Sequence, residues 1–171
     1  SCSNQTRGLV LGGMYQGIHN NTIEFMTIAQ NGNSVDFGDL TTINVGPSGV
    51  SNQTRGLCFF GSTTPSRSNG IEYVTIATTG NAADFGDMLT VQAFSLGFAG
   101  DSSRAVLGGG ITPSVVDTIQ FITMPSTGNA IDFGNLTQGR QSGQSVNSST
   151  RGIYGGGGNP APNAHNIMDF I

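Results

Sequence analysis

Arginine and aspartate are the charged residues of this 171-residue sequence that recur at regular intervals. The arginines are spaced 48, 49 and 47 residues apart, and the aspartates open Asp-Phe-Gly or closely related segments; the two sets are Arg7, Arg55, Arg104 and Arg151, and Asp36, Asp84 and Asp132. One arginine and one aspartate per copy could form an ion pair that ties strands together, since guanidinium binds carboxylate and carbonyl oxygens. A ring of arginines lining a ligand channel is the alternative. We favour the structural role, because packing residues recur once per repeat and catalytic residues rarely do.

The Asp-Phe-Gly segments could also suggest metal or phosphate chemistry. Asp36 with Asp39 would give Ca²⁺ two carboxylates, but Ca²⁺ takes six to eight oxygens, and the third copy has Asn135 at the second place. A protein kinase uses the same triplet together with a phosphate-contacting lysine. All six cations here are arginine, which excludes that activity. We therefore expect turns with side-chain-to-backbone hydrogen bonds, and neither a metal nor another cofactor.

The remaining reactive side chains form no catalytic set. His19 and His165 both follow a glycine pair, and no Ser-His-Asp or Cys-His arrangement can be placed around them. Cys2 and Cys58 occupy different places in the repeat, so we interpret them as small buried side chains, with their oxidation state undetermined. The sequence therefore predicts a protein that is not an enzyme.

Composition excludes two classes of partner. The net charge is −4 and the charged share is only 9%. A nucleic-acid binder needs clustered cations to displace counterions from phosphates, and none are clustered here. No apolar run approaches the length of a membrane span.

These residues lie in an internal repeat of about 48 residues, which predicts the elements that position them. Each copy reads as four short strands with turn signals between them: a small-residue strand, Arg-Gly with apolar residues, Ile-Glu-Phe-Met-Thr-Ile or its equivalent, and Asp-Phe-Gly. Gly-Asn marks the connection before the last strand, because both residues tolerate positive φ. The units are approximately 1–40, 41–89, 90–136 and 137–171, with the first and last incomplete. The sequence predicts an all-β chain.

The order of glycine pairs and aromatic residues resembles kelch repeats. Three glycine pairs stand where kelch blades have theirs, and the second copy departs with Phe60-Gly61: Gly12-Gly13, Gly109-Gly110 and Gly156-Gly157. Aromatic residues occupy the two later aromatic positions: Phe25, Tyr73, Phe121 and Phe170 at the first, and Phe37, Phe85 and Phe133 at the second. The sequence pattern of the whole chain is similar to that of kelch-like repeats in virion proteins of tailed phages. The resemblance implies a β-propeller of four-stranded blades with a structural or host-contact role.

Three functions follow as expectations. The first is a non-enzymatic virion module, such as a tail, fibre or decoration protein, that contacts copies of itself, other virion proteins or a surface glycan. The second is a self-assembling extracellular filament subunit. The third is a carbohydrate-binding propeller domain of a larger enzyme. The connections after the glycines differ most between copies (14–21, 62–69, 111–117 and 158–166), and such loops are where repeat proteins bind partners.

Overall fold

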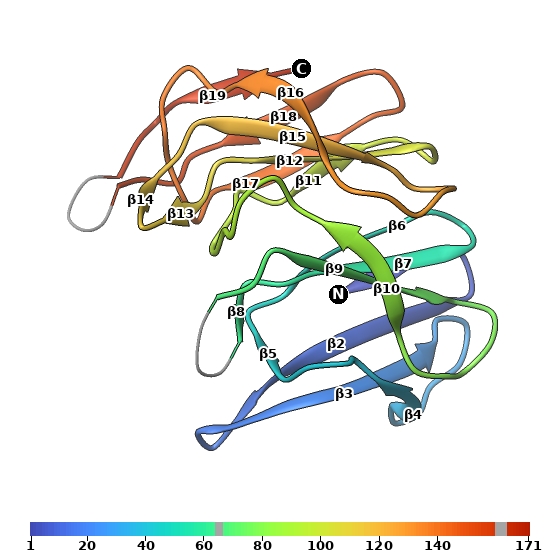
Figure 1. Cartoon of the computed structure of the whole chain (residues 1–171). Coiled ribbons are helices and arrows are strands. Elements are labelled where there is room, and N and C mark those ends of the chain that lie inside the picture. Colours follow the sequence, from blue (N-terminus) through green and yellow to red (C-terminus); the bar gives the residue numbers. More distant parts are fainter. Residues whose placement is uncertain (64–66, 160–163) are drawn as a thin grey trace.

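The chain is an all-β protein in which every regular element is a strand. The computed structural model describes residues 1–63, 67–159 and 164–171, and no helix occurs among them (Figure 1). The strands are β1 (Cys2–Ser3), β2 (Arg7–Tyr15), β3 (Ile18–Thr27), β4 (Val35–Asp39), β5 (Asn44–Val45), β6 (Ser48–Ser51), β7 (Arg55–Phe59), β8 (Ser62–Thr63), β9 (Gly70–Thr75), β10 (Ala83–Asp87), β11 (Phe98–Gly100), β12 (Arg104–Gly108), β13 (Ile111–Thr112), β14 (Ser114–Val115), β15 (Thr118–Thr123), β16 (Ile131–Asn135), β17 (Gln144–Asn147), β18 (Gly152–Gly155) and β19 (Met168–Phe170).

Each copy of the repeat forms one main antiparallel sheet, and β5 with β8 and β13 with β14 form two small two-stranded sheets. The first three sheets have four strands each, in the orders β1-β2-β3-β4, β6-β7-β9-β10 and β11-β12-β15-β16. This confirms the prediction of four short strands per unit for these copies. The fourth sheet has the order β17-β18-β19, and the described residues include no fourth strand equivalent to β4, β10 and β16. The last two strands of each complete sheet pair through a register shift, a β-bulge located at Asp36–Gly38 and its equivalents.

A short side-chain turn fixes where each arginine strand begins. Asn4 Oδ1 accepts hydrogen bonds from the backbone N–H groups of Thr6 and Arg7, at 2.9 and 2.8 Å. Asn52 and Asp101 make the same bonds in the second and third copies. Such turns are a usual role for Asn and Asp before a strand. They place the arginine at the same point of each sheet.

The hydrophobic core lies between successive sheets, and the four sheets follow one another through the molecule (Figure 1). Alternation along the strands gives each middle sheet two apolar faces. Cys58, Val74 and Ile76 of the second sheet pack against the first sheet, while Leu57 and Ile71 pack against the third. The core between the third and fourth sheets is smaller and includes Tyr154. Repetition of the sequence therefore produces repetition of the junction between sheets.

Candidate functional site

The repeated arginines stack on aromatic rings rather than pairing with aspartate. The guanidinium carbons of Arg7, Arg55, Arg104 and Arg151 lie 4.7, 4.8, 5.0 and 5.2 Å from the ring centroids of Phe25, Tyr73, Phe121 and Phe170. Each ring belongs to the adjacent strand at a diagonal position, within reach of a long side chain. Within each sheet, these contacts hold the strand that begins at or directly after the arginine against the adjacent strand that carries the aromatic ring.

The predicted ion pairs with Asp36, Asp84 and Asp132 are wrong. In the described part of the chain, the one ion pair joins Arg140 and Asp169. The reason is topological, because the aspartate strand lies beyond the aromatic strand, two positions from the arginine. The three aspartates are solvent-exposed instead.

Two of the arginines also bind the following sheet. Arg7 Nη1 donates to the carbonyl of Ile76 at 2.8 Å, and Arg55 Nη1 donates to the carbonyl of Met124 at 3.0 Å. The donors and acceptors are 69 residues apart in both cases, so the repeat itself reproduces the contact. Arg104 has the same ring contact, but the position 69 residues after it lies outside residues 1–171.

This difference gives a matched test of the structural role of the arginines. We expect Arg55→Gln to lower the free energy of unfolding by about 1–3 kcal/mol, because it removes a charge-assisted hydrogen bond and a ring contact. Arg104→Gln removes only the ring contact and should cost less than about 1 kcal/mol. Urea denaturation of both variants measures the difference. Equal effects would show that the bond to Met124 contributes nothing, and an unchanged Arg55 variant would favour a ligand-binding role.

The Phe-Gly-Asp segment of one sheet contacts the Gly-Asn turn of the next sheet at two junctions, between the first and second sheets and between the second and third. The backbone N–H groups of Gly80 and Ala82 donate to the carbonyls of Phe37 and Asp39, both at 2.8 Å, and Asn81 Oδ1 accepts from the N–H of Asp39 at 3.0 Å. Gly128, Asn129 and Ala130 make the same three bonds to Phe85 and Asp87 at the same distances. The bulged Asp-Phe-Gly strand is therefore a docking edge for the next sheet.

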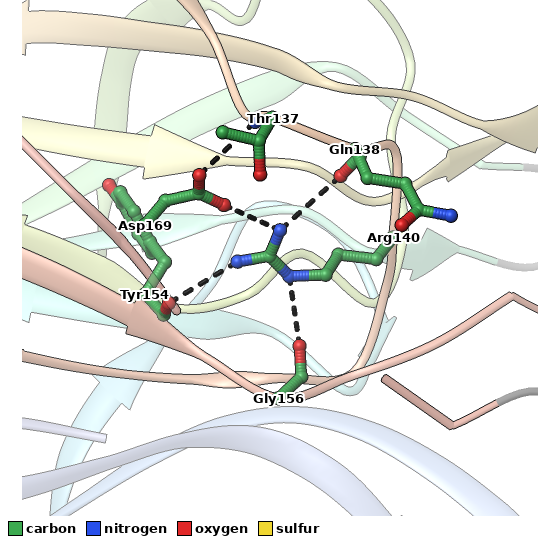
Figure 2. A network of polar contacts seen from close by, with 6 residues as sticks. All are labelled: Thr137, Gln138, Arg140, Tyr154, Gly156 and Asp169. Carbon is green, nitrogen blue, oxygen red and sulfur yellow. Dashed lines mark hydrogen bonds and ion pairs between the residues drawn. The ribbon is translucent and has the colours of Figure 1, made fainter. Parts of the chain in front are cut away.

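A buried polar pair also lies at the second and third junctions, and its residues differ between the two. Gln120 Nε2 donates to Gln92 Oε1 at 2.9 Å, and at the next junction the same two positions hold Arg140 and Asp169, 2.6 Å apart. Arg140 is completely buried; its Nε donates to the carbonyl of Gly156 and its Nη2 to that of Tyr154 (Figure 2). Burial of a charge requires such partners.

Positions 72, 120 and 169, each in the third strand of its sheet, also accept hydrogen bonds from the backbone of the segment that leads from the preceding sheet into their own. Asp169 Oδ1 accepts from the N–H of Thr137 at 3.2 Å, Gln120 Oε1 from Leu89 at 2.8 Å, and the Glu72 carboxylate from Thr41 at 3.1 Å. Sequence reasoning missed these residues. The sequence signal that could have identified them is a polar residue at the same place of an apolar strand in every copy. Arg140 belongs to no repeated motif, so no such signal marks it.

Glu72 occupies this position without a cation. Its side chain is buried, and loss of hydration raises its pKa to about 7, although the hydrogen bond from Thr41 opposes the shift. An acid whose pKa is raised on folding stabilises the fold below its unfolded pKa. That contribution is lost as the pH rises through about 7.

We therefore expect Glu72→Gln to raise the free energy of unfolding by about 1–2 kcal/mol at pH 8. Glutamine occupies the equivalent position 120 and accepts the equivalent bond, so the amide should fit. Denaturation at pH 4 and pH 8 measures the effect, which should be confined to the higher pH. The reciprocal Gln120→Glu should introduce the same pH dependence, and a loss of stability in Glu72→Gln at pH 8 would contradict the assignment.

The other reactive side chains are not brought together. His19 lies in β3 of the first sheet, and His165 precedes β19 of the fourth. Both cysteines are free and buried, which confirms their interpretation as small buried side chains, and burial raises the pKa of Cys2 to about 11. Among residues 1–63, 67–159 and 164–171, no three His, Cys, Asp or Glu side chains cluster as a metal site would require. The same residues contain no helix long and apolar enough to cross a membrane.

The variable connections gather on one side of the molecule. The β2–β3 turn, β8 and the β13–β14 hairpin all lie on the left in Figure 1. We call the described parts of segments 14–21, 62–69, 111–117 and 158–166 the variable rim; residues 64–66 and 160–163 lie outside the described residues. Met14 and Ile18 project from the β2–β3 end with more than half of their surface exposed. The rim is the part of the molecule where the copies differ most.

Comparison with known proteins gives no assignment. No protein-family model matches the chain, and no curated protein matches it significantly.

Proposed function

We propose that the chain is a non-enzymatic structural and adhesion module of a tailed-phage virion, located in a tail, fibre or decoration protein. The observation that carries the proposal is the recurrence of the same contacts at successive junctions, with variation concentrated at one rim. The bonds between Phe37–Asp39 and the next Gly-Asn turn repeat with unchanged distances one copy later. A regular frame with variable loops is the arrangement that binding scaffolds use.

The proposed architecture is a β-propeller, with each sheet as a blade of kelch type. Support comes from four-stranded antiparallel sheets of one order, packed face to face through apolar cores. Propellers combine blades of this kind around an axis. The resemblance of the glycine pairs and aromatic residues to kelch repeats supports the same architecture.

The partners that suit the variable rim are surface glycans and neighbouring virion proteins. Its described segments are rich in Asn, Ser and Thr, with exposed apolar side chains such as Met14 and Ile18. Amide and hydroxyl groups hydrogen-bond sugar hydroxyls or polypeptide without bringing charge, and exposed apolar groups can cover the faces of the partner. Such partners would place the protein in a virion or outside the cell.

The location is tested with antibodies against the purified chain. We expect immunogold labelling of intact phage particles at the tail or capsid surface, and peptides of the chain in the mass spectrum of gradient-purified particles. Particles prepared from a mutant phage lacking the gene provide the control. Detection of the chain only in soluble lysate, never in particles, would exclude a virion component.

One observation favours a filament subunit as a second function. Val10, Met26 and Ile28 form the outward face of the first sheet, and Ile28 is 56% exposed whereas its equivalents Ile76 and Met124 are fully buried under the preceding sheet. A second copy that supplies a sheet at this face would bury it in the same way.

Head-to-tail growth is tested by electron microscopy and light scattering of the purified chain alone. A filament subunit would form polymers without any other virion component, and Met26→Asp with Ile28→Asp would abolish them. Ile18→Asp, on the rim, is the matched control. A monomer at every accessible concentration would reject this second function and leave the first unaffected.

A further inference from the structure

The fourth sheet has an uncovered edge. In the other sheets the third strand is covered by β4, β10 or β16, whereas β19 has no strand on its outer side in the described chain. Met168 and Phe170 of β19 are 77% and 71% exposed. Their equivalents in the second sheet, Ile71 and Tyr73, are fully buried and half-buried. An open edge presents unpaired N–H and C=O groups and pairs readily with another strand.

A cavity of about 150 Å³ lies beside this edge, lined among others by Arg104, Phe133 and Ile171. Ile171 pairs with Gly152 as Ile122 pairs with Ala105. At the preceding junction the residue two places after Ile122 is Met124, which is completely buried and whose carbonyl accepts from Arg55. The cavity beside Arg104 therefore corresponds to the apolar site that Met124 fills at the preceding junction.

The docking edge of the third sheet is uncovered too. Phe133 is 43% exposed, whereas Phe37 and Phe85 are 2% exposed beneath the next Gly-Asn turn. A Cβ added at Gly38 or Gly86 would lie 2.5 Å from the backbone of that turn, but a Cβ at Gly134 would meet nothing within 4 Å. The backbone groups of Phe133 and Asn135 are therefore accessible to a turn of the same kind.

We propose that β19, the cavity beside Arg104 and the Phe133–Asn135 edge together form one binding site for an extended segment with the pattern of residues 75–88, Thr-Ile-Ala-Thr-Thr-Gly-Asn-Ala-Ala-Asp-Phe-Gly-Asp-Met. The segment comes from outside residues 1–171 and completes the fourth sheet.

Each part of the segment has a defined partner. Its apolar residue fills the cavity, and the carbonyl of that residue accepts from Arg104. Its Gly-Asn turn bonds the backbone of Phe133 and Asn135. Its Asp-Phe-Gly pairs antiparallel with β19, and its phenylalanine packs edge-to-face on Phe170, as Phe85 does on Tyr73 with ring centroids 5.9 Å apart. These contacts are copies of those at the two complete junctions.

The test uses the whole chain and a fluorescein-labelled peptide of residues 75–88. We expect saturable one-to-one binding by fluorescence polarisation, with hydrogen-exchange protection of Met168–Phe170. A peptide with Phe85→Ala should bind about tenfold more weakly, since it loses a buried ring. A scrambled peptide is the control for non-specific edge pairing.

Gly134→Ala is the decisive protein variant. It creates no clash in the free chain but places a methyl group where the peptide backbone must lie, so peptide binding should be lost. Circular dichroism checks that this variant is folded, and Val146→Asp, an exposed change on β17, should leave binding unchanged. Binding that survives Gly134→Ala, or protection elsewhere than β19, would overturn the proposal.

A direct extension covers the case in which the free peptide binds too weakly to detect. Residues 75–88 are appended after Ile171, in the register that the repeat defines, and compared with a scrambled extension. The extended chain should melt several degrees higher than the scrambled control, because joining the segments raises their effective concentration. The proposal fails if the peptide shows no binding and the two extensions melt at the same temperature.

Discussion

Arg140→Gln will lower the free energy of unfolding by about 3–5 kcal/mol, the cost typical of breaking a buried ion pair. Arg140 is fully buried, and its loss removes the cation beside Asp169 Oδ2 together with the donors to the carbonyls of Tyr154 and Gly156 (Figure 2). The exposed Arg67→Gln is the matched control and should change stability by less than about 0.5 kcal/mol. Guanidinium chloride denaturation measures both variants.

The neighbouring junction makes this prediction sharper. There the same two positions hold Gln92 and Gln120, which bond each other directly. The double variant Arg140→Gln with Asp169→Gln should therefore recover much of the stability lost by either single change, giving a coupling free energy of about 1–3 kcal/mol. Additive effects of the two substitutions would contradict the view that the positions act as a pair.

The pair also predicts a dependence on pH opposite to that of Glu72. Burial tends to raise the pKa of Asp169, but hydrogen bonds from Thr137 and Arg140 outweigh it and hold the pKa below its usual range. A depressed pKa contributes stability above the unfolded value, which is lost as the pH falls through the folded value. Acid unfolding of the double glutamine variant should lack this contribution.

Gly86→Ala will destabilise the fold roughly twice as much as Gly134→Ala. Both glycines have φ of +142°, so each substitution carries the same backbone strain of about 1–3 kcal/mol. At Gly86 the added Cβ would also lie 2.5 Å from the carbonyl oxygen of Gly128, and relief of that clash costs about 1–3 kcal/mol more. Thermal and urea denaturation of the two variants isolates the contribution of the junction.

The comparison separates local strain from contact between sheets. Gly38→Ala, which meets the backbone of Gly80, should behave like Gly86→Ala. If all three variants lost the same stability, the close approach of Phe-Gly to the Gly-Asn turn would contribute nothing to the fold.

The repeat pattern was sufficient to predict the four main strands of each complete copy, because local signals define them, but it did not predict the short strands β5, β8, β13 and β14. Short β-branched runs, glycine pairs and the Gly-Asn pairs each specify a strand or a turn without knowledge of the rest of the chain. The all-β class and the four strands per complete copy follow from these signals and are confirmed.

Contacts between strands and between sheets could not be predicted in the same way. The recurrence of Arg7 and Asp36 at fixed spacing suggested a pair, but strand order placed the aromatic strand between them. The partnership of Arg140 with Asp169 depends on how one sheet packs on the next, and neither residue lies in a motif that identifies its partner. Recurrence shows that a residue matters to the unit, while topology decides what it touches.

The most direct test of the proposed function is binding of the purified chain to a panel of bacterial surface glycans. The panel is repeated with a variant in which segments 14–21 and 111–117 are replaced by glycine-serine linkers, and with Glu72→Gln as a control that alters the frame but not the rim. We predict that the native chain and the control bind at least one glycan without cleaving it, and that the rim variant does not. Glycan turnover, or equal binding by the rim variant, would contradict a non-enzymatic module that binds through its variable loops.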